Sequence, residues 1–405
     1  MTVGLVLVIV VAAAYLAARV AFDWLGRKFL IVSGAEYLLL GILLGPHVSG
    51  ILAPDVVDSL APITTLALGW IGAVVGVQFF LPDLVKVPGL TYRVALVESL
   101  ITFSLVFVAE LFAIAWLYET PLRDAALPAA ALGGIATASS AAAVELTARR
   151  LGDRGVEVTQ LRISAMMNAV FAVSAFGLLA SVWHTPVIVV GRPLTATEWM
   201  AITLGIGAVG GILFHLFVGD ERHTDRLFVS LGGGVILVSG AAAYAGCSPL
   251  LSALLFGAIL VNTSRNRAEI VAALLRVERP LYFVLLVFAG AAWRPSARAW
   301  LLPVLLFLLV RYAAKIFGAR FASWTNGLEP VLGKSWGRGL VGQGGLALAI
   351  ALNYVYQDGG TLPYFVFTAA IASVLLTDLV SAHLVKSVLA PLLARRTAGS
   401  VGENQ

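Results

Sequence analysis

Long apolar segments follow one another through almost the whole chain. A helix that crosses a bilayer needs about 20 mostly apolar residues, and we count thirteen segments in the 405-residue sequence that can serve as spans. Sixty per cent of the residues are hydrophobic and only 12% are charged, whereas a soluble protein carries about 25% charged residues. The apolar runs are continuous and do not alternate, which favours helices over the strands of a membrane barrel. The sequence therefore predicts an all-α protein that crosses the membrane many times.

The ninth and tenth predicted spans are the shortest of the thirteen. In chain order, the approximate limits of the spans are 3–18, 29–46, 60–81, 92–118, 125–148, 161–183, 197–218, 227–246, 248–262, 280–293, 299–319, 338–356 and 363–391.

Lysine and arginine are unequally divided between the two sides of the predicted membrane. With the N-terminus outside, the inner loops and the C-terminal tail hold 21 of the 27 cationic residues, and the outer loops hold four. Membrane proteins concentrate these residues in their cytoplasmic loops. We therefore expect the N-terminus outside and the C-terminus in the cytoplasm. The net charge of +5 follows from the same bias, so it does not indicate binding to nucleic acid.

The two remaining cations, Arg311 and Lys315, lie inside the apolar segment 299–319. A charged side chain near the bilayer centre costs roughly 2.5–3.5 kcal/mol on insertion scales. Residues four apart share one face of a helix, so we expect this face to look onto a polar interior and not onto lipid. Lysine can give up its proton when it is buried, whereas arginine stays charged.

The thirteen predicted spans divide into two halves of six spans joined by the seventh. Span n then corresponds to span n + 7, and because seven is odd the two halves insert with opposite topology, as in many secondary transporters. We expect a first inverted repeat over residues 1–183, a linking span within 184–226, a second inverted repeat over 227–396 and a short cytoplasmic tail over 397–405.

The fifth span of each half is interrupted by glycine and small polar residues, at LGGIATASSAAA (132–143) and GRGLVGQGGLALA (337–349). Broken helices at matching positions are a sequence sign of a binding site near the membrane midplane, because their free backbone groups can hold an ion. The polar side chains at the two breaks are Thr137, Ser139, Ser140 and Gln343. They are candidate contacts for an ion or substrate, and the alternative is that they cap half-helix ends.

Seven segments, in this order and spacing, resemble the cation:proton antiporter family, the sodium/proton exchangers. The resemblance covers most of residues 30–350. Its segments are EYLLLGILLGP (36–46), GVQFFLPDL (76–84), IATASSAAAVELTARRLG (135–152), CSPLLSALLFGAILVNTS (247–264), ERPLYFVLLVFAGA (278–291), RYAAKIFGA (311–319) and LVGQGGLALAIAL (340–352).

The resemblance implies two broken helices that cross at the midplane beside a carboxylate of the sixth span. In the family this carboxylate binds Na⁺ or Li⁺ in one half-cycle and H⁺ in the other, and a basic residue of the eleventh span lies nearby. The resemblance also implies a homodimer with a core that moves like an elevator. We expect the location to be the bacterial inner membrane.

The sixth span departs from the family pattern at the ion-carrying position. Where the family has Asp-Asp or Asn-Asp, this chain has Asn168-Ala169. Asn168 offers a carbonyl oxygen to a hard cation but cannot be deprotonated, and proton antiport needs a group that gains and loses a proton in the working pH range.

Four acids inside the predicted spans are candidate counter-ions for the two cations, and these four and Glu36 are candidate substitutes for the missing aspartate. Two lie on the fourth span, which the repeat pairs with the eleventh, and one lies four residues before Arg149, where a local ion pair is favoured. The four are Glu98, Glu110, Glu145 and Asp378.

The best single function is antiport of a monovalent cation, Na⁺, K⁺ or Li⁺, against H⁺ through Asn168, the two breaks, Lys315 and Arg311. One alternative is an organic-anion carrier of related architecture, because two cations without a central acid favour an anion. Another is a non-transporting relative. The sequence contains no His-Glu-x-x-His motif and no nucleophile elbow, so we expect no enzyme, no cofactor and no resident metal.

Overall fold

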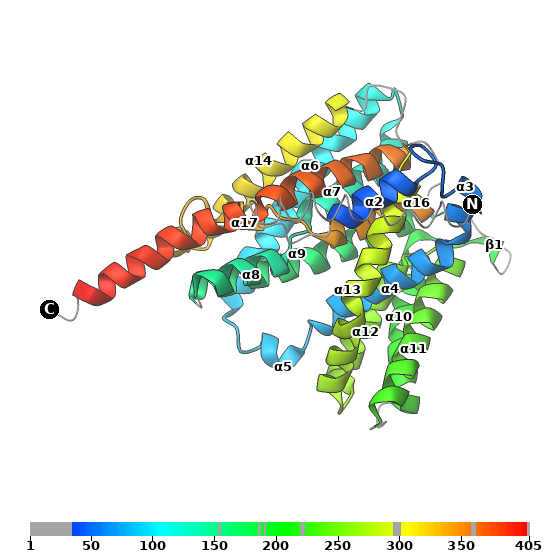
Figure 1. The fold of residues 1–405 in the computed structure, drawn as a ribbon, viewed down its shortest axis with the longest axis horizontal. Helices are drawn as coiled ribbons and strands as arrows, with labels where there is room; N and C mark the ends of the chain where they lie inside the picture. Colours follow the sequence, from blue (N-terminus) through cyan, green and yellow to red (C-terminus); the bar gives the residue numbers. More distant parts are fainter. Residues whose placement is uncertain are drawn as a thin grey trace, which may run out of the picture.

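The computed structural model describes residues 35–152, 155–184, 188–189, 192–218, 223–294, 301–357 and 362–402. The predicted first span, 3–18, and the side on which the N-terminus lies fall outside these residues. The described elements are α2 (Ala35–Leu44), α3 (Pro54–Ser59), α4 (Ala61–Val77), α5 (Leu81–Leu84), α6 (Gly89–Leu117), α7 (Leu122–Thr137), α8 (Ala141–Leu151), α9 (Val156–Ala180), η1 (Ser181–Trp183), β1 (Ile188–Val189), β2 (Arg192–Pro193), α10 (Ala196–Val218), α11 (Thr224–Tyr244), α12 (Pro249–Thr263), α13 (Arg267–Ala292), α14 (Leu301–Thr325), α15 (Glu329–Leu332), η2 (Trp336–Leu340), α16 (Gly345–Gln357) and α17 (Leu362–Gly402) (Figure 1).

The described part of the chain contains seven helical stretches that are long and apolar enough to cross a membrane. Their outward faces carry large exposed apolar side chains, including Trp116, Phe217 and Leu309, as expected of surfaces that meet lipid. The prediction of an all-α protein with many spans is confirmed. A two-residue antiparallel pairing between β1 and β2 is the only strand structure among the described residues.

Each predicted span after the first coincides with a helix or with a pair of half-helices. The limits differ most at the tenth and thirteenth spans. Helix α13 begins at Arg267, well before the predicted 280, and α17 continues to Gly402. The additional helical turns contain charged residues such as Glu269 and Arg276. A helix can continue into the aqueous boundary after its apolar run has ended, which is why the predicted limits are too short.

The helices pack as two neighbouring groups (Figure 1). Helices α6, α7, α8, α9, α14, α16 and α17 contact one another in the first group, and α2, α4, α10, α11, α12 and α13 make the second. Helix α16 also contacts α12 and α13, so the second half of one broken span lies where the two groups meet.

A close crossing of α2 and α13 depends on two glycines. A Cβ atom at Gly41 would lie 2.0 Å from the carbonyl oxygen of Val287, and one at Gly290 would lie 2.2 Å from the carbonyl oxygen of Leu38. Both distances are shorter than real Cβ contacts, so the backbones approach closely only because neither residue has a side chain.

The crossing of α4 and α12 repeats this geometry. A Cβ atom at Gly76 would lie 2.0 Å from the carbonyl oxygen of Leu254, and one at Gly257 would lie 2.3 Å from that of Ala73. In both crossings, each glycine faces the carbonyl of the residue three positions before the partner glycine. Under the predicted correspondence of span n with span n + 7, α2 corresponds to α12 and α4 corresponds to α13. The α2–α13 crossing therefore corresponds to the α12–α4 crossing.

Candidate functional site

The two predicted breaks are present and lie against each other. Residues 138–140 separate α7 from α8, and residues 341–344 separate η2 from α16. Three hydrogen bonds join the two broken spans. They run from the Ser140 amide to the Gly342 carbonyl (2.7 Å), from Ser139 Oγ to the Leu340 carbonyl (2.8 Å) and from Gln343 Nε2 to the Ile135 carbonyl (2.5 Å). The prediction of two broken, crossing helices is confirmed.

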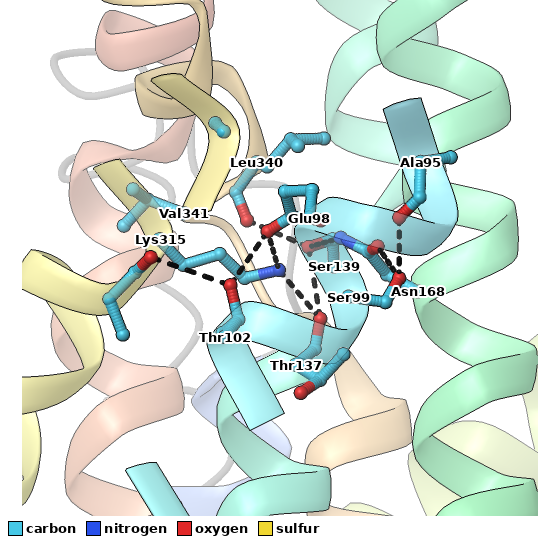
Figure 2. Close-up of polar contacts among 12 residues, drawn as sticks. Ala95, Glu98, Ser99, Thr102, Thr137, Ser139, Asn168, Lys315, Leu340 and Val341 are labelled. Carbon is cyan, nitrogen blue, oxygen red and sulfur yellow. Dashed lines mark hydrogen bonds and ion pairs between the residues drawn. The ribbon is translucent and has the colours of Figure 1, made fainter. Parts of the chain in front are cut away.

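Lys315 extends from α14 into this crossing and pairs with Glu98 of α6 (Figure 2). Its Nζ lies 3.1 Å from Glu98 Oε1 and donates a 2.8 Å hydrogen bond to the Thr137 carbonyl. Both side chains of the ion pair are 0% exposed. Since Thr137 is the last residue of α7, the ammonium also meets the negative end of that half-helix dipole.

Glu98 has one oxygen that is engaged and one that is not. Its Oε1 atom accepts hydrogen bonds from both Lys315 and Thr102 Oγ1, the latter at 2.9 Å. Its Oε2 atom is buried and has no hydrogen-bond partner among the described residues. A buried carboxylate oxygen without a partner is costly, and a proton or a bound cation at this atom would remove that cost.

Arg311, one turn before Lys315 on α14, meets the other broken span. One of its terminal guanidinium nitrogens donates a 2.6 Å hydrogen bond to the carbonyl of Val341, the residue that follows η2. The side chain is 1% exposed, and the carboxylates that act on it electrostatically are Asp378 and Glu98. The two cations of α14 therefore each meet the carbonyl end of one half-helix.

The opposite, positively polarised ends of the half-helices meet oxygen acceptors. Ser140 Oγ accepts from the Ala143 amide at 3.3 Å and caps α8. Asp378 Oδ1 accepts from the Gly344 amide at 3.4 Å, immediately before α16. These contacts match the macrodipole of each half-helix, and each engages one amide near the N-terminus of its half-helix.

Asn168 links the sixth span to both α6 and the first break (Figure 2). Ser99 Oγ lies within hydrogen-bonding distance of Asn168 Oδ1 (2.6 Å) and of the Ala95 carbonyl (2.8 Å). Asn168 Nδ2 donates to Ser139 Oγ at 3.0 Å. The side chain of Asn168 is fully buried, and Ala169 beside it is also buried. Neither Asn168 nor Ala169 carries a charge.

The structure brings together most of the side chains that the sequence singled out. Around the crossing lie Thr137, Ser139, Ser140, Asn168, Arg311, Lys315, Gln343, Glu98 and Asp378. Two of the candidate acids lie elsewhere. Glu145 pairs with Arg149 at 2.8 Å on the exposed side of α8. Glu110 lies twelve residues after Glu98 on α6 and is also buried, and its Oε1 has no hydrogen-bond partner among the described residues.

Sequence reasoning did not identify Ser99, Thr102 or Ser373. The hydroxyl of Thr102 supports Glu98, that of Ser99 supports Asn168, and Ser373 Oγ donates to Gln343 Oε1 at 2.6 Å. Ser99 and Thr102 lie one and four residues after an acid within a span, so small hydroxyl residues beside an intramembrane acid are a usable sequence signal.

Replacing Gln343 with leucine tests how strongly the crossing is held. The substitution removes the hydrogen bond to Ile135 and leaves the Ser373 hydroxyl without its acceptor. A buried polar group left unsatisfied costs about 1–3 kcal/mol, so we expect a clear fall in the unfolding temperature of the protein in detergent. Gln78→Leu, at an exposed position after α4, is the control and should have little effect. Equal effects of the two substitutions would contradict the role of Gln343.

The arrangement offers oxygen atoms for a small cation and two groups that can exchange a proton. The oxygens belong to Glu98, Asn168, Ser99, Ser139 and the Thr137 carbonyl, which are the hard donors that alkali cations prefer. Glu98 and Lys315 can both gain or lose a proton, whereas arginine and asparagine cannot. No cluster of three or more His, Cys, Asp or Glu side chains suited to a metal ion occurs among the described residues.

Two structures of the sodium proton antiporter MjNhaP1 from Methanocaldococcus jannaschii are similar to this chain. One, at pH 8, aligns with a TM-score of 0.65 and 15% identity, covering 95% of this chain and 100% of the other. The second, from an electron-microscopy map, aligns with a TM-score of 0.63 and 14% identity, covering 96% and 99%. No protein-family model and no curated protein sequence matches the chain. The chain therefore has the fold of a sodium proton antiporter, as the sequence resemblance implies.

Proposed function

We propose that this multi-pass membrane protein exchanges a monovalent cation, Na⁺, K⁺ or Li⁺, for H⁺, and that Glu98 is the carboxylate on which the two compete. The observation that carries the proposal is the buried Lys315–Glu98 pair at the crossing of the two broken spans. The similarity to solved sodium proton antiporters supports the same class of transport.

Competition of the cation and the proton for the Glu98 carboxylate couples the movement of one to the movement of the other. With Glu98 ionised, its Oε2 can join Asn168 and the hydroxyls of Ser99 and Ser139 as ligands of a dehydrated cation. With Glu98 protonated, that negative charge is absent and a cation loses its main attraction. Lys315 also donates to the Thr137 carbonyl, a contact with the end of α7 that does not involve Glu98.

Two inverted repeats, 1–183 and 227–396 joined by the span within 184–226, form part of the proposal. The two glycine crossings support it, because Gly41 and Gly257 occupy equivalent places, as do Gly290 and Gly76. We also propose insertion in a bacterial inner membrane with the N-terminus outside, assembly as a homodimer and a cytoplasmic end after 396, where α17 continues to Gly402.

An organic-anion carrier is less well supported than cation antiport. Lys315 already has Glu98 and a carbonyl as partners, and Arg311 has the Val341 carbonyl. The amide before α16 faces Asp378, whose negative charge would repel an anionic substrate. In a non-transporting relative the buried Lys315–Glu98 pair would serve stability alone, and no cation would drive proton flux.

Proton flux in proteoliposomes that contain a pH-sensitive dye tests the proposed function. Addition of Na⁺, K⁺ or Li⁺ should drive proton movement through the wild-type protein. Asn168→Ala should raise the half-saturating cation concentration about tenfold, because loss of one ligand worth about 1.4 kcal/mol is a factor of ten. Asn326→Ala, at the end of α14 away from the crossing, is the matched control.

Absence of flux with all three cations would contradict cation antiport. Thermal stabilisation by members of a carboxylate panel, together with no response to alkali cations, would favour the anion carrier instead.

A further inference from the structure

A cavity of about 730 Å³ lies between α8 and α9, away from the crossing of the broken spans. Its lining includes Glu145 and Arg149 of α8, Gly152 after it, and Thr159 and Arg162 of α9. Arg149 is in the last turn of α8, ten residues after Ser139. With a rise of about 1.5 Å per residue, Arg149 lies about 15 Å along α8 from Ser139, and Arg162 lies about 9 Å along α9 from Asn168. None of the residues that line the cavity belongs to the crossing of the broken spans, so the cavity is a separate feature.

The charge of this cavity is positive. Arg149 is paired with Glu145 at 2.8 Å, which leaves Arg162 as an exposed cation with no ion pair among the described residues. Arg150, next to Arg149 and also exposed, adds to the positive field. Guanidinium groups bind phosphate oxygens through paired N–H donors, so the expected occupant is an anion with phosphate chemistry.

The surroundings of the cavity match the boundary of a membrane. Helices α8 and α9 both belong to stretches that are long and apolar enough to span a bilayer, and the cavity lies where the first ends and the second begins. Leu146 on α8 and Val156 at the start of α9 are exposed, the latter by 70%. A basic cavity beside exposed apolar side chains fits an amphiphile better than a freely soluble anion. Anionic phospholipids of the cytoplasmic leaflet have this chemistry.

We propose that the α8–α9 cavity binds the phosphate of an anionic phospholipid, with Arg162 and Arg149 as its ligands. The bound headgroup bridges α8 and α9 at this end. At the other end, the Asn168–Ser139 hydrogen bond joins α9 to the segment before α8. The lipid therefore stabilises the same pair of segments that positions Asn168.

Thermal unfolding of the full-length protein in nanodiscs tests this site without any transport measurement. Nanodiscs of phosphatidylcholine with phosphatidylglycerol should give a higher unfolding temperature than nanodiscs of phosphatidylcholine alone. The doubly substituted Arg149→Gln, Arg162→Gln protein should lose most of this increment. Arg320→Gln, which removes an exposed arginine of α14 outside the cavity lining, should keep it. All three substituted arginines are exposed, and circular dichroism checks that the helices of each variant are intact.

Three outcomes would overturn the proposal. They are an increment that survives in the double substitution, an equal loss in Arg320→Gln, and an equal increment from inorganic phosphate with phosphatidylcholine nanodiscs. The last would assign the cavity to a soluble anion. Because none of these measurements depends on ion flux, failure of the lipid site is distinguishable from failure of the proposed antiport.

Discussion

Glu98→Gln should abolish cation-coupled proton flux and destabilise the protein. The change removes the negative partner of Lys315 while both positions remain 0% exposed. Breaking a buried ion pair from one side costs about 3–5 kcal/mol, because the remaining charge is uncompensated. Glutamine keeps the size of the side chain and its ability to accept from Thr102, so the expected effect comes from charge and from the lost exchangeable proton. Dye-based flux measures the loss of transport, and denaturant unfolding in detergent measures the loss of stability.

Combining Glu98→Gln with Lys315→Met should restore most of the stability but none of the transport. Removing both members of a buried pair leaves no isolated charge, so the double substitution should be more stable than Glu98→Gln alone, and the mutant cycle should give a large coupling energy. The exposed pair Lys86–Asp83, 2.8 Å apart, is the control, with an expected coupling of about 0–1 kcal/mol. Full flux in Glu98→Gln would contradict the role of this carboxylate, and additive losses would contradict the ion pair.

Gly41→Ala should destabilise the protein by about 3 kcal/mol, the upper end of the usual overpacking range. The new methyl group would lie 2.0 Å from the carbonyl oxygen of Val287, and a backbone oxygen cannot move aside as a flexible side chain can. The helices α2 and α13 would have to separate. Unfolding temperature in detergent and the yield of folded protein report the effect.

Gly240→Ala is the matched control for this prediction. A Cβ atom at Gly240 of α11 would meet nothing within 4 Å, and alanine is favoured over glycine in a helix by roughly 0.5–1 kcal/mol. This substitution should be neutral or slightly stabilising. Gly76→Ala should match Gly41→Ala, since its methyl group would also lie 2.0 Å from a carbonyl oxygen. If Gly41→Ala were as stable as Gly240→Ala, the close crossing would be refuted.

Much of the fold was predictable because its signals are local. The length of each apolar run indicates a span, and the glycine and small polar residues near 138–140 and 341–344 weaken helices at those points in any surroundings. The error at α13 has the same origin, since apolar length does not report how far a helix continues into water. The cost of charge in lipid similarly predicted that Arg311 and Lys315 would be buried with partners, and both are.

The identity of those partners depends on contacts between distant segments. Glu98 is 217 positions from Lys315 in the chain, and Glu110 is a second buried acid on the same helix. No local pattern distinguishes the two acids, so the packing of α6 against α14 selects between them. The length of an apolar run specifies a span, and helix-breaking residues specify a break, because each acts on the backbone that is nearby in the sequence. The pairing of Lys315 with Glu98 and of Arg311 with the Val341 carbonyl arises only where α14 meets α6 and the second break in space.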